Sequence, residues 1–162
     1  MAPDDPFALD LAWTHVSPRL AAARLTVAAC WLVPLAVVVA LPAVLSGVAG
    51  LWALPAVVVL LMVWLLWLVP RQARALMYAE REDDLLIRRG IMFRSLVVVP
   101  YGRMQFVDVK AGPIDRAFGI AGVQLHTASP SSDASIAGLP PAEAARLRER
   151  LASRGEARLA GL

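Results

Sequence analysis

The sequence lacks ionisable side chains over a long internal stretch. From Leu25 to Pro70 it contains no lysine, arginine, aspartate, glutamate or histidine. A bilayer core of about 30 Å is crossed by roughly 20 apolar helical residues, so this stretch suffices for two crossings and a turn. It is too long for a signal peptide and has no polar face for a soluble helical hairpin. Two spans without an ionisable residue also offer no ion path of their own, which argues against a channel.

Cysteine and histidine are scarce. The single cysteine, Cys30, excludes an intramolecular disulfide and a cysteine-based zinc site. No partner ligand stands near His15, and His126 is the only histidine of the predicted domain. Ser129, Ser131 and Ser132 lie in a polar loop in which no base is evident. Asp83 and Asp84 are adjacent, so their side chains on a strand would face opposite sides. Acid–base and nucleophilic catalysis need a positioned partner. We therefore expect no enzyme, and no catalytic, cofactor-binding or metal-binding residue.

Serine and glycine divide the apolar stretch into two predicted helices. The segment SGVAG at 46–50 favours a turn and separates spans at about Leu25–Leu45 and Leu51–Val69. Prolines inside the spans are compatible with bilayer helices, because neighbouring groups satisfy the carbonyls that proline leaves free. Four tryptophans suit anchoring at the membrane interface: Trp31, Trp52, Trp64 and Trp67.

Arginine placement predicts the orientation of these spans. Arg19 and Arg24 precede the first span, Arg71 and Arg74 follow the second, and the connecting loop is uncharged. The positive-inside rule therefore predicts a multi-pass protein of the cell membrane with both termini in the cytoplasm. The predicted parts are an N-terminal cytoplasmic segment at 1–24, a transmembrane hairpin at 25–70, a cytoplasmic domain at 71–153 and a frayed tail at 154–162.

The N-terminal segment begins with a proline- and aspartate-rich stretch that is predicted to be disordered. A helix is predicted from Leu20 and is expected to run into the first span. Trp13 and Val16 precede this helix. Two contacts are open for them: the membrane surface or the surface of the domain.

Beyond Arg74 the hydrophobic period changes from helical to alternating. Short strands are predicted at 76–78, 85–87, 91–99, 104–109, 123–127 and 134–136, with a polar turn at 129–133. Proline near its start and glycine after its end predict a helical turn at Pro113–Phe118. Pro140–Leu151 is predicted to be an amphipathic helix. Its buried face carries Ala144, Leu147 and Leu151, and its exposed face carries Glu143, Arg146, Glu149 and Arg150.

Strands this short cannot bury both faces of a flat sheet, so a curled arrangement closed by the last helix is favoured. The predicted fold class is an α+β membrane protein. An N-terminal transmembrane helical hairpin is followed by a curled antiparallel β-sheet or open barrel with a C-terminal α-helix.

Three segments carry a family resemblance: DLLIRRG (84–90), VPYGRMQFVDVKAGPIDRAFGIAGVQLHTAS (99–129) and IAGLPPAEAARLRERL (136–151). Together they resemble the bacterial PH-domain family, in its membrane-anchored branch with two transmembrane helices before one domain. The resemblance covers roughly Arg19 to Leu151. It implies a pleckstrin-homology-like barrel without catalytic residues that acts through protein contacts or self-assembly. Phosphoinositide binding is not implied, because the chain lacks a lysine-rich loop between its first strands.

The polar side chains of the second segment have two open interpretations. Either Asp108 pairs with Arg103 or Arg116 to tie loops together, or Arg103, Gln105 and Arg116 form part of a contact surface. The apolar residues of the same segment are expected in the core: Val99, Val107, Val109, Ile114 and Phe118.

Recognition of anionic lipid at the inner leaflet is the alternative function. The candidate lipid-facing residues are Arg71, Arg74, Arg88, Arg89 and Arg94, with Arg81 expected on the same side. Basic residues near an anionic leaflet contribute about 1 kcal/mol each, but the same arginines also serve to set topology. The expected partners are the membrane, a protein or a second copy of the chain, and an anionic lipid. The basic pI is weak evidence for nucleic-acid binding, and no nucleic-acid partner is expected.

Overall fold

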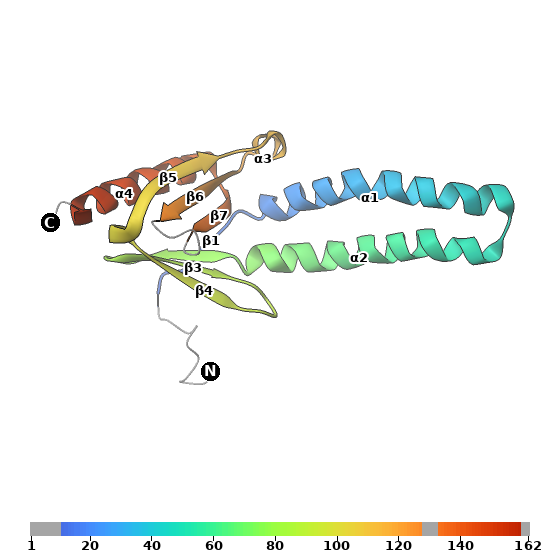
Figure 1. The fold of residues 1–162 in the computed structure, drawn as a ribbon, viewed down its shortest axis with the longest axis horizontal. Helices are drawn as coiled ribbons and strands as arrows, with labels where there is room; N and C mark the ends of the chain where they lie inside the picture. The colour runs from blue at the N-terminus through green and yellow to red at the C-terminus, as the bar shows by residue number, and fades with distance from the viewer. Residues whose placement is uncertain (1–10, 128–132, 160–162) are drawn as a thin grey trace.

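The computed structural model describes residues 11–127 and 133–159, which form a two-helix hairpin joined to a small α+β domain (Figure 1). The predicted disordered stretch at 1–10, most of the polar turn at 129–133 and residues 160–162 lie outside the described residues. The hairpin consists of α1 (Arg19–Ser46), η1 (Ala49–Trp52) and α2 (Ala53–Arg74). The domain contains β1 (Thr14–His15), β2 (Met77–Glu80), β3 (Asp84–Arg89), β4 (Ser95–Pro100), η2 (Tyr101–Arg103), β5 (Met104–Lys110), α3 (Pro113–Ala117), β6 (Ala121–Thr127), β7 (Ala134–Leu139) and α4 (Pro141–Leu159).

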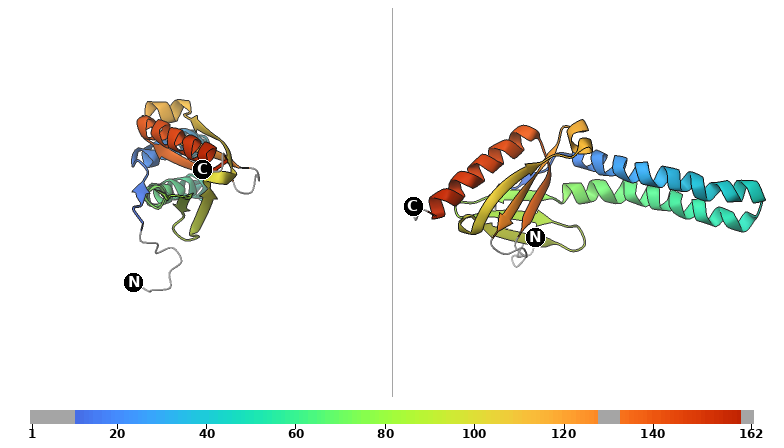
Figure 2. Two further views of the ribbon diagram at one scale, coloured as in Figure 1. Left: turned by 90° about the vertical axis from the view of Figure 1, so that its left-hand side faces the viewer. Right: turned by 45° about the horizontal axis from the view of Figure 1, so that its top comes forward.

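The helical hairpin turns at the glycine-containing break. Helix α1 ends at Ser46, and Gly47 follows it with a φ of 67°, a left-handed conformation that glycine adopts without strain. Both helices are long and apolar enough to cross a membrane, with mean hydropathies of 2.4 and 2.5. Their apolar side chains point outward, with Trp31 and Leu45 more than three-quarters exposed. The hairpin projects from the domain as a rod (Figure 2).

The domain consists of two antiparallel sheets and a covering helix. The strand orders are β1-β2-β3-β4 and β5-β6-β7, so β4 and β5 are edge strands joined through η2. Helix α4 packs on β5, β6 and η2, and its predicted apolar face, Ala144, Leu147 and Leu151, is fully buried. The sheets remain open and do not close into a barrel. The predicted fold class is confirmed.

Most of the predicted core residues pack as expected. Val99 is buried, while Val107, Ile114 and Phe118 are partly buried against the core. The prediction for Val109 is wrong, because this residue is 39% exposed. It precedes the last residue of β5, where the strand runs out toward α3 (Figure 1).

The predicted strand at 91–99 begins too early. Strand β4 starts at Ser95, and residues 91–93 form the turn of the β3–β4 hairpin. Gly90 has a φ of 93°, and a Cβ built on it would lie 1.9 Å from the carbonyl oxygen of Phe93. The chain therefore folds back on itself at a position that only glycine tolerates.

The last helix extends further than predicted. Helix α4 continues to Leu159, so the residues from 154 to 159, expected to be frayed, are helical. The reason is tertiary: Arg154 donates hydrogen bonds of 2.9 Å to the Tyr101 hydroxyl and to the Arg81 carbonyl. These contacts hold the additional turns of α4 against η2 and the end of β2.

The N-terminal segment packs on the domain, which settles the alternatives left for Val16. Strand β1 pairs with β2 through Thr14–Tyr78 and His15–Met77. Val16, Leu20 and Ala23 belong to the same buried cluster as the sheet residues. The backbone N–H of Ser17 also donates to the Gly138 carbonyl at 2.8 Å. The first turns of α1 and the domain thus share one hydrophobic core.

The Leu20–Gly138 contact provides a stability test of this shared core. Gly138 has a φ of 79°, and a Cβ on it would lie 2.7 Å from the Cβ of Leu20. We expect Gly138→Ala to lower the free energy of unfolding by about 1–3 kcal/mol, because both the backbone and the packing resist a side chain. Thermal unfolding of the detergent-solubilised protein measures the change.

Gly122→Ala is the matched control, because its Cβ would meet nothing closer than 3.5 Å. Equal unfolding temperatures for the two variants would contradict the shared core.

Candidate functional site

The domain histidine has a partner that the sequence pattern did not reveal. His126 Nδ1 lies 3.1 Å from Asp133 Oδ2, and the His126 ring stacks on Phe106 with a centroid distance of 4.2 Å. Asp133 Oδ1 also accepts a hydrogen bond of 2.9 Å from the Thr127 backbone N–H. These contacts hold the ring on the outer face of the second sheet. Within residues 11–127 and 133–159, no three His, Cys, Asp or Glu side chains form a group suited to a metal ion.

The predicted contact residues are exposed but do not converge. Arg103 lies in η2, Gln105 in β5 and Arg116 in α3. Elements η2 and α3 lie at opposite ends of β5 (Figure 1). The structure therefore brings Arg103 and Gln105 together and leaves Arg116 apart. The pairing interpretation is wrong: among the described residues neither arginine forms an ion pair with Asp108, which lies opposite Gln124 in β6.

Phe106 joins this surface although the alternating pattern did not indicate it. A bulge in β5 between Met104 and Phe106 shifts the register against β6. Met104 is therefore buried, whereas Phe106 turns to the outer face and is 52% exposed. A bulge adds one residue to a strand and so reverses the faces beyond it. A half-exposed aromatic ring beside Gln105 is the kind of residue that protein interfaces favour.

The five candidate lipid-facing arginines gather at the end of the domain where α2 enters it, here called the helix-proximal end. Arg71 and Arg74 lie in the last turn of α2, while Arg88, Arg89 and Arg94 flank the turn of the β3–β4 hairpin. The guanidinium of Arg71 lies 3.8 Å from the centre of the Trp67 ring, a cation–π contact.

Arg81 does not belong to the helix-proximal end. It follows β2 at the far end of the strand, with its guanidinium 3.7 Å from the Asp84 carboxylate. The expectation that it lies on the same side as the other arginines is wrong, because β2 carries the chain away from α2 before the turn at 81–83 (Figure 1).

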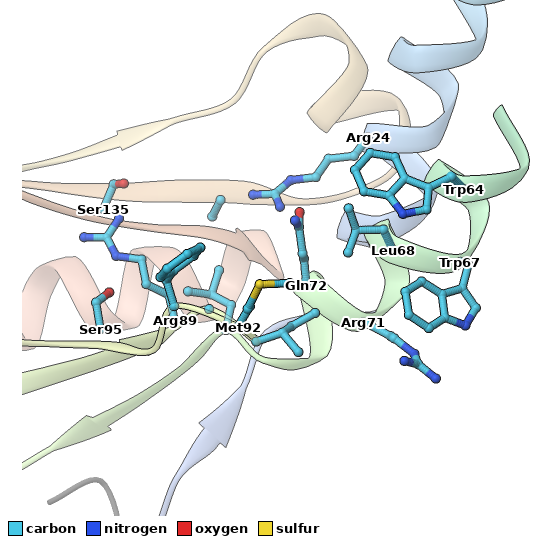
Figure 3. Close-up of a pocket in the computed structure, with 15 residues that line it drawn as sticks. Arg24, Trp64, Trp67, Leu68, Arg71, Gln72, Arg89, Met92, Ser95 and Ser135 are labelled. Atoms are coloured by element: carbon cyan, nitrogen blue, oxygen red, sulfur yellow. The ribbon is translucent and has the colours of Figure 1, made fainter. Parts of the chain in front are cut away.

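A cavity of about 650 Å³ lies at the helix-proximal end, within the size range of ligand sites. Four parts of the chain line it: Arg24 of α1, residues of α2, the turn of the β3–β4 hairpin, and Ser135 and Ala137 of β7. Figure 3 shows Arg24 and Gln72 directed into it from one side and Arg89 near Ser135 on the other, while Arg71 points away. Among the described residues no carboxylate lines the cavity, so its field favours an anion.

A polar network at the opposite end joins α4 to the first sheet. The Tyr78 hydroxyl donates to Glu143 Oε1 at 2.7 Å, and Arg146 Nε donates to Glu143 Oε2 at 3.0 Å. Arg146 also reaches Glu80 at 3.2 Å, and Arg150 approaches the other Glu80 oxygen at 3.5 Å. Glu143 and Arg146 are therefore half-buried rather than exposed as predicted, because their partners come from β2.

The network shifts the ionisation of its members. Burial, together with the hydrogen bond to Glu143 and its charge, raises the pKa of Tyr78 to about 12. The hydrogen bond from Arg146 holds the pKa of Glu143 below its ordinary value, and the same bond raises the pKa of Arg146. These directions agree with a carboxylate–guanidinium pair that holds α4 in place.

Comparison with known proteins points to one family. The family model described as "Bacterial PH domain" matches residues 20–155. The transmembrane protein YdbS of Bacillus subtilis (strain 168) is 31% identical over 109 residues. That alignment covers 66% of this chain and 64% of YdbS, so less than two thirds of the relative is matched. No solved structure matches the chain.

The raised pKa of Tyr78 predicts a loss of stability in alkali. The folded state favours the neutral phenol, so this contribution is complete below the ordinary tyrosine pKa of 10.0 and is lost as the pH rises toward about 12. Of the two tyrosines in the chain, burial also raises the pKa of Tyr101. We expect tyrosinate absorbance to appear at a higher pH in the native protein than in the unfolded chain. The variant Tyr78→Phe is expected to lack the absorbance step near pH 12. An ordinary titration of both tyrosines would contradict the network.

The lowered pKa of Glu143 predicts the opposite behaviour in acid. Its ionised form is stabilised by Arg146, so the contribution is present above the ordinary value of 4.5 and is lost as the pH falls through the lowered pKa. We expect Glu143→Gln to destabilise the protein at neutral pH and to flatten its acid unfolding curve. The matched control is Glu149→Gln on the exposed face of α4. Parallel curves for native protein and Glu143→Gln would contradict the assignment.

Proposed function

This chain belongs to the bacterial PH domain family, and on that premise we propose that it is a membrane-tethered, non-enzymatic interaction module. It binds a protein partner, or a second copy of itself, beside the membrane. Neither the family description nor the name of the relative denotes an enzyme, and the relative is named a transmembrane protein. We assign the membrane segment of this chain to its two apolar helices, because both are long and apolar enough to cross a membrane.

The proposed topology has two crossings with both termini in the cytoplasm. Arg24 and Arg71 stand at the domain side of the two helices, and the connecting turn at 47–52 carries no charge. Cytoplasmic segments are enriched in arginine and lysine, which supports a cytoplasmic domain.

The single observation that carries the proposal is the shared core of hairpin and domain. Leu20 and Ala23 of α1 and Ala73 of α2 are buried with the sheet residues, so the domain is held at one distance from the helices. A domain held in this way meets partners in the same membrane at a raised effective concentration. Such a tether suits recognition of a membrane-bound protein better than capture of a soluble one.

The proposed contact surface is the β5 edge, defined by Arg103, Gln105 and Phe106. Strand β5 is the outer strand of its sheet, so its free backbone groups are open to an added strand. Phe106 provides the exposed apolar side chain, and Arg103 and Gln105 provide polar contacts at the start of the strand. Arg116 extends the predicted surface only for a partner that spans the length of β5.

Site-specific crosslinking in native membranes tests this surface. A benzoylphenylalanine at position 106 is expected to form an adduct of defined mass, either a dimer of this chain or a complex with one other protein. In a separate two-hybrid or pull-down assay with that partner, Phe106→Ala is expected to weaken binding about tenfold, because exposed aromatic anchors contribute more than 1 kcal/mol.

The control probe is placed at Glu149, which is exposed on the face of α4 opposite its buried residues Ala144, Leu147 and Leu151. Adducts at both positions alike, or at neither, would count against the β5 edge as the contact surface.

A further inference from the structure

The turn of the β3–β4 hairpin presents three consecutive apolar side chains to its surroundings. Ile91 is 40% exposed, Met92 85% and Phe93 88%. Arg89 at the end of β3 and Arg94 just before β4 flank them. Large apolar side chains gathered at the tip of a turn are unusual on a surface that faces only water, and they mark interaction sites. An apolar tip bordered by arginines matches the polarity gradient at the edge of a bilayer.

This tip lies at the level where the apolar part of the helices ends. The uncharged stretch runs from Leu25 to Pro70, directly bordered by Arg24 and Arg71. Figure 1 shows the β3–β4 hairpin beside the domain end of α2. Trp67 lies one turn before Arg71, a position typical of the aromatic belt at a membrane interface. The cavity between the tip and α2 therefore lies at the boundary between apolar and charged surface.

The lining of the cavity is amphipathic. Trp64 and Leu68 of α2 face Met92 of the hairpin turn and provide apolar walls, as Figure 3 shows. Arg24 and Arg89 approach from two different elements on opposite sides. Because the part of the chain that the structure describes places no carboxylate in this space, a bound molecule must supply the negative charge. A matching ligand has an anionic group joined to an apolar chain.

We propose that this cavity binds one anionic phospholipid from the leaflet next to the domain. Its phosphate lies between Arg24 and Arg89, and its acyl chains follow Trp64, Leu68 and Met92 along α2 into the bilayer. The cavity is not enclosed, so the chains continue beyond it. The site uses residues other than the β5 edge, so this proposal goes beyond the protein-contact function and does not depend on it.

A transmembrane helix from a partner protein is the competing occupant. An apolar helix would cover Trp64 and Met92 but would leave the guanidinium groups of Arg24 and Arg89 desolvated without a counter-charge, which is costly. A phospholipid satisfies both requirements with one molecule. Charge complementarity therefore favours the lipid.

Lipid retention by the full-length protein tests the proposal. Native mass spectrometry is applied to the detergent-solubilised chain supplied with dioleoyl phosphatidylglycerol, with dioleoyl phosphatidylcholine, or with soluble glycerol phosphate. We expect one phosphatidylglycerol to be retained, with retention reduced at least tenfold in the variant carrying Arg24→Gln and Arg89→Gln. Arg19, Arg71 and Arg74 remain in that variant and preserve the charge bias of the hairpin.

Arg148→Gln is the matched control, because Arg148 is exposed on α4, a helix that contributes no residue to the cavity lining. Equal retention of both lipids, or equal loss in the control, would overturn the proposal. Retention of glycerol phosphate alone would show a soluble phosphate site instead, and copurification of a partner helix in place of lipid would also refute it.

A depth measurement gives a second test that does not depend on lipid surviving purification. In a Cys30→Ala background the chain has no cysteine, so Met92→Cys can carry a single spin label in reconstituted vesicles. We expect oxygen, which concentrates in lipid, to speed the spin relaxation of this label. A label at Glu149→Cys is expected to relax faster with a water-soluble relaxation reagent instead. A water-accessible label at position 92 would place the cavity outside the bilayer and overturn the proposal, whatever the outcome of crosslinking at Phe106.

Discussion

The packing of the first turn of α1 into the domain is the contact on which the rest of the structure depends. Leu20 lies against Gly138 of β7, so closely that a single added carbon would collide with it. Ala73 at the end of α2 enters the same core. Two helices and two sheets are thereby joined through buried apolar contacts, which are short-ranged and intolerant of gaps. The domain is set at one height and one angle relative to the hairpin.

That fixed arrangement gives the two ends of the domain different characters. The helix-proximal end carries the arginines and the apolar turn of the β3–β4 hairpin, beside the last turns of α2. The far end carries the acidic turn at 82–84 and the network that connects Glu80 and Glu143 with the arginines of α4. The arginines of that network are paired with carboxylates, whereas no carboxylate among the described residues lines the cavity at the helix-proximal end. The helix-proximal end therefore suits an anionic surface. The β5 edge lies between these ends and remains open to a protein.

The polar network at the far end shows how a half-buried ion pair can hold an element in place. Glu143 and Arg146 are neighbours on α4, but their position is determined by Tyr78 and Glu80, more than sixty residues earlier. Removing one member would leave its partners half-buried without their hydrogen bonds or counter-charge. The free-energy cost of that loss exceeds the net stabilisation that the intact pair provides. Contacts with distant residues also explain the extension of α4 to Leu159, since Arg154 donates hydrogen bonds to the Tyr101 hydroxyl and to the Arg81 carbonyl.

Local periodicity determined the helices, the glycine break, most strands and the apolar face of α4, because each depends on residues a few positions apart. It did not determine the exposure of Phe106, which follows from a bulge set by pairing with β6. Nor did it reveal that residues 91–93 turn outward or that β1 joins the first sheet. The cavity beside Arg24 and Arg89 is formed by segments distant in the chain. Side-chain period is a property of the sequence, whereas register, bulges and cavities depend on which distant segment lies alongside, and only the tertiary structure decides that.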